Sequence, residues 1–240
     1  MAGIMVVIDF DKTIIEVDSA TDLFNQLVPT MPWNSVTVTS IGCDLRIVSD
    51  ANILFFLFTI LDHLGMSNCF SDINTNPSYV DEERRRRISP YVDFHSRSRG
   101  CTNPCPPNMD PMPINMSSFS RMIVEKIQAS LANEGKKRII YIGDGAGDFC
   151  PSLKLKEGDF IMPRKNFPVW DLKCKNRTRL RAKVHEWVDG EELEHVLLTF
   201  IEKMSIEGTI NSNPAQLLSV HCKSNTIAVA AQEALPPPLK

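Results

Sequence analysis

Residues 4–13 read IMVVIDFDKT: five apolar residues, followed at once by Asp9 and Asp11. An unbroken apolar run of this length is typical of a parallel strand whose two faces are both buried. The aspartates then lie at the carboxyl end of the strand, the edge at which open α/β sheets bind ligands. We expect the backbone to turn after Phe10, so that both carboxylates reach a single ligand.

The acid pair alone allows two interpretations. Neighbouring carboxylates repel each other unless a cation or a shared proton offsets their charge. A hard divalent ion such as Mg²⁺, which prefers oxygen ligands, would supply that offset. The alternative is a strand that ends in a solvated Asp-x-Asp turn without a ligand.

Two further stretches repeat this arrangement. Residues 138–148 read RIIYIGDGAGD, an apolar strand that delivers Asp144 and Asp148 among glycines that permit a tight turn. Residues 44–52 read DLRIVSDAN, a strand followed by polar residues before a helix-like apolar stretch. A hydroxyl and backbone N–H groups at a helix N-terminus bind anions, so we expect Ser49 to hold a phosphate oxygen. Three strand ends of this kind predict one polar site.

The remaining pattern fits an α/β fold. Amphipathic spacing predicts helices over residues 117–133 and 189–204, and residues 160–162 read as a further strand. We expect a short strand at residues 70–76 and a hairpin with polar turns over residues 79–94. The sequence therefore predicts a Rossmann-like parallel sheet flanked by helices.

The composition is that of an ordinary globular chain. Of its 240 residues, 43% are hydrophobic and 23% are charged, and the formal net charge of −3 gives no indication of a nucleic-acid groove. The run Arg84–Arg87 reads as a nuclear signal or as a solvated loop or hairpin, and short charge runs favour the second. Residues 51–61 are too short to span a bilayer, and no basic leader precedes the first strand. We expect a cytoplasmic protein that binds neither nucleic acid nor membrane, and the oligomeric state stays open.

The three motifs resemble those of a known family. The stretches DFDKT (9–13), IVSDAN (47–52) and IGDGAGD (142–148) are similar to motifs one, two and four of the haloacid dehalogenase superfamily of phosphohydrolases. Further stretches resemble the phosphoethanolamine/phosphocholine phosphatase branch, which includes plant inorganic pyrophosphatases and thiamine phosphate phosphatase-like proteins: DLFNQLVPTMPW (22–33), CPPNM (105–109), GDGAGDFCPSL (143–153) and MPRKNFPVW (162–170).

The resemblance implies a role for each acid. Asp9 would attack phosphorus and form an aspartyl-phosphate. Asp11 would serve as general acid for the leaving group and then as general base for water. Mg²⁺ would be held by Asp9, Asp144 and the backbone carbonyl of Asp11, with Asp148 as a further ligand.

Two residues of motif two are expected to contact the substrate. Ser49 would bind a phosphate oxygen. Asp50 resembles the family position that contacts the non-phosphate end of the substrate, where a carboxylate would suit a cationic amine. The alternative for Asp50 is a helix N-cap or an acid in the first helical turn.

The chain departs from the family in the segment after motif one. Only 37 residues, 12–48, lie between motifs one and two, and they include the second strand itself. The family inserts a helical cap domain there, and several helices of ~11–12 residues each do not fit. We therefore expect the cap to be largely missing and reduced to about residues 17–40.

Motif three also departs from the family. Alignment of the helix from Met122 to Leu131 with the family places Ser120 where the family has a lysine that balances charge, with Arg121 and Lys126 as nearby cations. Further along the chain, Arg164 and Lys165 read either as cations that reach a phosphate or as part of a solvated loop.

These features predict a Mg²⁺-dependent phosphohydrolase core over residues 1–204 and a disordered tail over residues 205–240. We expect a small phosphorylated substrate such as pyrophosphate, phosphocholine or phosphoethanolamine. The alternative is a catalytically impaired paralogue or splice form that binds phosphate or a partner without turnover.

Overall fold

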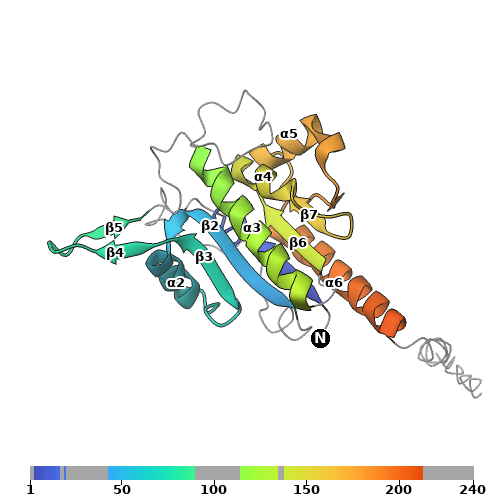
Figure 1. Ribbon diagram of the computed structural model, residues 1–240, viewed down its shortest axis with the longest axis horizontal. Helices are drawn as coiled ribbons and strands as arrows, with labels where there is room; N and C mark the ends of the chain where they lie inside the picture. The colour runs from blue at the N-terminus through green and yellow to red at the C-terminus, as the bar shows by residue number, and fades with distance from the viewer. Residues whose placement is uncertain (1–2, 17–18, 20–42, 90–113, 135–137, 213–240) are drawn as a thin grey trace, which may run out of the picture.

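A six-stranded parallel sheet forms the centre of the fold (Figure 1). The computed structural model describes residues 3–16, 19, 43–89, 114–134 and 138–212. Within them, the sheet consists of β1 (Ile4–Ile8), β2 (Asp44–Ile53), β3 (Asp72–Asn76), β6 (Arg138–Gly143), β7 (Phe160–Pro163) and β8 (Lys183–Val184). The spatial order is β3-β2-β1-β6-β7-β8, and each neighbouring pair is parallel. This is the order of a doubly wound Rossmann-like sheet, and it confirms the predicted fold class.

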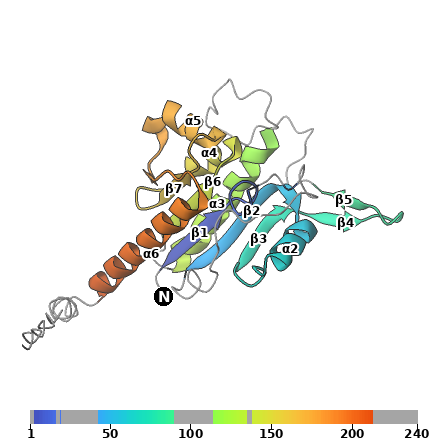
Figure 2. The ribbon, with the colours of Figure 1, turned by 180° about the vertical axis from the view of Figure 1, so that it is seen from behind.

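Helices cover both faces of this sheet. Strand β1 shows why: Ile4, Val6 and Ile8 belong to one core cluster, whereas Met5 and Val7 belong to the other. The first cluster is covered by α2 (Leu54–His63) and α6 (Gly190–Ser212), and the second by α3 (Ile114–Glu134) and α5 (Pro168–Lys175). Figure 1 shows α3 across the near face, and Figure 2 shows α6 across the opposite face.

Short elements connect these layers. The 3₁₀ turn η1 (Ala146–Asp148) and helix α4 (Phe149–Ser152) follow β6, and η2 (Arg177–Arg179) precedes β8. Strands β4 (Ser78–Val80) and β5 (Arg86–Ile88) form a two-stranded hairpin that projects from the fold (Figure 1). Asp81 accepts hydrogen bonds from Arg85 and Arg87 within it. The prediction of an exposed hairpin for the arginine run is therefore confirmed.

Strand β2 is longer than the sequence predicted. It runs to Ile53, and α2 begins only at Leu54, so Ser49 and Asp50 lie in extended backbone instead of at a helix N-terminus. The interpretation of Asp50 as a helix cap or first-turn acid is therefore wrong. The physical reason is an irregular pairing with β3: Val48 pairs with Asn74 and Ile53 with Asn76, so the strand continues past a bulge at residues 49–52.

The closing helix is also longer than expected. Helix α6 continues to Ser212, eight residues beyond the predicted end at Met204. Met204 is still buried, and the Ser205 hydroxyl donates to the carbonyl of Ile201, so the helical turn persists past the predicted boundary. Apart from Ser19, the predicted reduced cap lies outside the described residues, as does the chain after Ser212. The division into core and tail stays a prediction.

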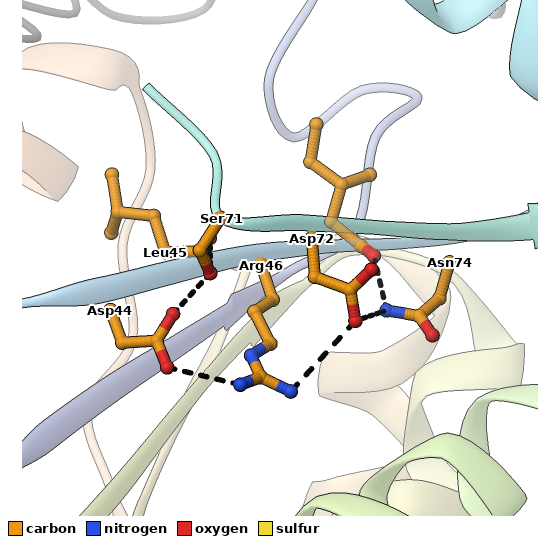
Figure 3. A network of polar contacts seen from close by, with 7 residues as sticks. Asp44, Leu45, Arg46, Ser71, Asp72 and Asn74 are labelled. Carbon is orange, nitrogen blue, oxygen red and sulfur yellow. Dashed lines mark hydrogen bonds and ion pairs between the residues drawn. The ribbon is translucent and has the colours of Figure 1, made fainter. Parts of the chain in front are cut away.

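A polar network joins the outer strands β2 and β3 (Figure 3). The Arg46 guanidinium lies 3.1 Å from a carboxylate oxygen of Asp44 and 3.8 Å from one of Asp72. Ser71 donates hydrogen bonds to the Asp44 carboxylate and, at 3.1 Å, to the carbonyl of Leu45. These groups are partly exposed, so they add little stability, but they hold β3 in register with β2.

Gly65 follows the end of helix α2, and its backbone conformation leads to a prediction about the stability of the fold. Gly65 has φ +68, and a Cβ there would meet nothing within 4 Å, so Gly65→Ala adds only backbone strain. We expect this variant to lower the free energy of unfolding by about 1 kcal/mol in denaturant titrations. Gly158 also has open space around its Cα and no positive φ, so Gly158→Ala is the matched control. It should be neutral or slightly stabilising, and equal destabilisation of both variants would contradict the assignment.

Candidate active site

The segment after β1 makes the turn that the sequence predicted. The carbonyl of Phe10 accepts hydrogen bonds from the N–H groups of Thr13, Ile14 and Ile15 at 3.4, 2.8 and 3.3 Å. Lys12 adopts the left-handed backbone conformation, with φ 54, that closes the turn. Phe10 is fully buried, so the turn is fixed to the core and the acids on either side of it are directed to the sheet edge.

The segment after β6 positions two acids. The Tyr141 hydroxyl donates to Oδ1 of Asp148 at 2.7 Å, and the N–H of Gly145 donates to Oδ2 at 2.8 Å. A Cβ on Gly143 would overlap with the Asp148 carboxylate, so that position requires glycine. The Asp148 side chain is therefore held at both oxygens, with little freedom to move away from Asp144.

Three carboxylates meet where the chain order of the sheet reverses, between β1 and β6. One oxygen each from Asp9, Asp144 and Asp148 lies within 4.8 Å of the others. Asp144 and Asp148 are buried and Asp9 is half-buried. The Asp9 N–H donates to the carbonyl of Ile142 at 2.9 Å, which keeps the two strand ends aligned.

Burial raises the pKa of Asp144 to about 6. A hydrogen bond from the Thr13 hydroxyl, at 3.2 Å, and the positive charges of Lys12 and Arg164 act in the opposite direction. A hydrogen bond with Asp9 acts in the same direction as these contacts, but together they do not fully offset the cost of burying the Asp144 carboxylate. A cluster of oxygen ligands with uncompensated negative charge fits a hard divalent cation.

Asp11 stands apart from this group. Its carboxylate accepts hydrogen bonds from the backbone N–H of Ser19, at 2.9 Å, and from the Ser19 hydroxyl. The carboxylate is not one of the three that converge, so a metal contact by Asp11 would use its backbone carbonyl. Both predicted roles of Asp11, as metal ligand and as general acid, stay predictions.

Ser49 offers a hydroxyl at the same edge of the sheet. Ile47 pairs with Ile8, so Ser49 lies near the level at which β1 ends. Its side chain is 1% exposed, and within the described part of the chain its hydroxyl has no hydrogen-bond partner. A buried hydroxyl without a partner is costly and needs an explanation, for which a ligand oxygen is one candidate. The Asp50 side chain lies outside what the structure describes.

The replaced motif-three position is buried in α3. Ser120 is 5% exposed, and Arg121 lies 3.9 Å from Glu125 along the helix, whereas Lys126 is exposed. The cations whose charge acts on Asp144 are instead Lys12 and Arg164. Arg164 is buried, so the interpretation of this residue as part of a solvated loop is wrong, whereas Lys165 is exposed, as that interpretation expects.

Sequence reasoning missed the residues that hold the acids in place. Thr13, Ser19 and Tyr141 each donate a side-chain hydrogen bond to one of the carboxylates. Tyr141 could have been noticed from the sequence, because it lies inside an otherwise apolar strand and a buried phenol requires a hydrogen-bond partner. The bonds of Thr13 and Ser19 depend on the path of the loop, which the sequence does not reveal.

Comparison with known proteins agrees with this geometry. The family model described as "Putative Phosphatase" matches residues 27–201. The chain belongs to this phosphatase family. This match, together with the curated relatives, confirms the predicted membership of the haloacid dehalogenase superfamily, in its phosphoethanolamine/phosphocholine phosphatase branch.

Three relatives cover most of the chain. Inorganic pyrophosphatases 1 and 2 of Arabidopsis thaliana are each 44% identical to it, over 92% of this chain and 87% and 92% of their own length. A thiamine phosphate phosphatase-like protein of the same plant is 34% identical over 86% of this chain and 99% of its own. In the described segments, no helix is long and apolar enough to cross a membrane.

The close approach of Gly143 to Asp148 gives a second prediction. Gly143→Ala should lower the free energy of unfolding by ~1–3 kcal/mol in denaturant titrations, because its methyl group displaces a carboxylate held at both oxygens. The control is Gly145→Ala, whose Cβ would lie at an ordinary 3.5 Å from the same carboxylate. Equal stability of the two variants would contradict the described position of Asp148.

Proposed function

We propose that this chain is a Mg²⁺-dependent phosphohydrolase that acts through an aspartyl-phosphate on Asp9. The observation that carries the proposal is the convergence of Asp9, Asp144 and Asp148 within 4.8 Å at the carboxyl edge of a parallel sheet. The favoured substrate is inorganic pyrophosphate, because the relatives with 44% identity are inorganic pyrophosphatases. Phosphocholine and phosphoethanolamine are the alternatives that the branch implies.

The proposed reaction has two displacements. A carboxylate oxygen of Asp9 forms a bond to phosphorus while the bond from phosphorus to the leaving oxygen breaks, and Asp11 gives its proton to that oxygen. Water then attacks the phosphorus of the aspartyl-phosphate, its proton passes to Asp11, and the bond to Asp9 breaks. Inorganic phosphate leaves, and both aspartates return to their starting protonation states.

The residues for a metal ion are Asp9, Asp144 and Asp148, with the backbone carbonyl of Asp11. Bound Mg²⁺ would neutralise charge on the transferring phosphoryl group. The fit is supported by the raised pKa of Asp144, which reflects a buried carboxylate with too little positive charge near it. Ser49 is proposed to donate its hydroxyl to a phosphate oxygen, and Asp50 to contact the rest of the substrate.

A second candidate is a phosphate-binding protein without turnover. It is favoured by the buried Ser120 at the position where the family has its charge-balancing lysine. Lys12 and Arg164 supply positive charge at Asp144, and they support the active candidate. Turnover of any substrate by the unmodified chain decides between the two.

The direct test is phosphate release in the presence of Mg²⁺. We expect release from pyrophosphate or from one of the amine phosphates, and its loss on chelation of the metal. Asp9→Asn should reduce the rate by ~10³-fold or more, since the nucleophile is removed. Asp171→Asn, at an exposed acid in the first turn of α5, is the control for loss of one negative charge. Full activity of Asp9→Asn would overturn the proposed nucleophile, and no release by the unmodified chain would favour the second candidate.

Ser49 provides an independent test, because stability and function should change in opposite directions. Ser49→Ala removes a buried hydroxyl without a partner, so the free energy of unfolding should stay equal or rise. The same variant should raise KM or lower kcat/KM by ~10-fold, the cost of one lost hydrogen bond to a charged phosphate. Ser152→Ala is the comparison, since the Ser152 hydroxyl is buried but bonded to the carbonyl of Phe149. Unchanged kinetics in Ser49→Ala would remove Ser49 from the site.

A further inference from the structure

Arg164 contacts the loop after β1 at Lys12, a residue 152 positions away in sequence. It follows β7 and is only 7% exposed. Its Nη1 donates to the carbonyl of Lys12 at 2.5 Å, and its Nη2 donates to a carboxylate oxygen of Glu16 at 2.8 Å. Strand β6 lies between β1 and β7, so the side chain reaches past a whole strand to contact the loop after β1.

Two aromatic rings also pack against the guanidinium group of Arg164 and restrict its movement. Its central carbon lies 4.4 Å from the ring centre of Phe167 and 5.0 Å from that of Trp187. Trp187 is fully buried, and its Nε1–H donates to the carbonyl of Met162 at 3.0 Å. The Arg164 backbone N–H also donates to the carbonyl of Gly143 at 3.0 Å. A cation packed in this way loses little further freedom when it binds a partner.

The group that Arg164 holds is a strained peptide. Lys12 has φ 54, a left-handed conformation that is unfavourable for a residue with a side chain. Lys12 directly follows Asp11 and lies within the turn that separates Asp11 from Ile14. The contact at the Lys12 carbonyl therefore adds to the hydrogen bonds at the Phe10 carbonyl that hold this turn, and it does so at the residue next to Asp11.

We propose that Arg164 is a positioning residue that keeps the turn after Asp11 closed, and so holds Asp9 and Asp11 in place relative to Asp144 and Asp148, the acids that follow β6. The inference deepens the proposed function and rests on it. Of the two contacts, the one to the Lys12 carbonyl matters more, because the Glu16 side chain is 38% exposed and its ion pair is screened by water.

The first experiment compares two cations that are neighbours in sequence. Arg164→Lys keeps the charge but cannot reach both partners, whereas Lys165→Met removes one positive charge from the adjacent exposed residue. We expect kcat of Arg164→Lys to fall by ~10–100-fold, as small displacements of reacting groups do, with a much smaller change in KM. Lys165→Met should keep the kcat of the unmodified chain. An unchanged kcat in Arg164→Lys would overturn the inference.

A second pair of variants separates strain from charge. Lys12→Gly and Lys12→Ala remove the same charge, but only glycine adopts φ 54 without penalty. In the Arg164→Lys background, Lys12→Gly should therefore restore kcat by at least about threefold over Lys12→Ala, since about 0.6 kcal/mol of relieved strain corresponds to that factor. Equal kcat values for the two double variants would contradict a role through the turn.

A readout without turnover distinguishes failure of this inference from failure of the proposed function. The amides of Ile14 and Ile15, which bond to the Phe10 carbonyl, should exchange faster in Arg164→Lys than in Lys165→Met. If the unmodified chain turns over no substrate, the proposed function fails and amide exchange still decides the role of Arg164. If Arg164→Lys does not fold, the single variants Lys12→Gly and Lys12→Ala decide. Slower exchange of the Ile14 and Ile15 amides in Lys12→Gly than in Lys12→Ala supports the strained turn. Equal exchange in the two variants overturns the inference.

Discussion

Repulsion among three carboxylates is the constraint on which the site depends. Asp9, Asp144 and Asp148 approach within 4.8 Å, and two of them are buried, so their negative charges repel one another unless a cation or a shared proton offsets them. No local segment would adopt this arrangement alone. The parallel sheet imposes it, because β1 and β6 are neighbours and their carboxyl ends deliver these acids at the same level. The core on both faces of the sheet supplies the free energy that offsets the repulsion.

The hydrogen bonds around the acids follow from the same constraint. Tyr141 and Gly145 hold Asp148, Thr13 holds Asp144, and Ser19 holds Asp11. Each donor fixes the position of the carboxylate that it bonds, and the bond from Thr13 also lowers the pKa of Asp144. The pKa of Asp144 nevertheless stays raised, because burial outweighs these contacts. The site is thus ordered yet short of positive charge, a condition that favours the binding of a divalent cation.

The residues that are placed by the ends of strands could be predicted from the sequence. The contacts that depend on the path of a loop could not. The apolar runs at residues 4–8 and 138–142 required buried parallel strands, so the approach of Asp9 to Asp144 followed from topology. The turn after Phe10 was predicted so that the carboxylates of Asp9 and Asp11 would reach one ligand; the turn is present, but the Asp11 carboxylate bonds to Ser19 and is not among the three that converge. The buried position of Arg164 was not, because a cation after a strand looks solvated until the fold brings Phe167 and Trp187 around it. The bulge in β2 was hidden for a similar reason: it depends on pairing with β3.

The central claim is that Asp9 is the nucleophile of a metal-dependent phosphoryl transfer. The most direct measurement is to stop turnover of radiolabelled pyrophosphate with acid, digest the chain and locate the label by mass spectrometry. We expect label on Asp9, present with Mg²⁺ and absent when the metal is chelated. Turnover without any labelled peptide, or with label on another residue such as Ser49, would contradict it.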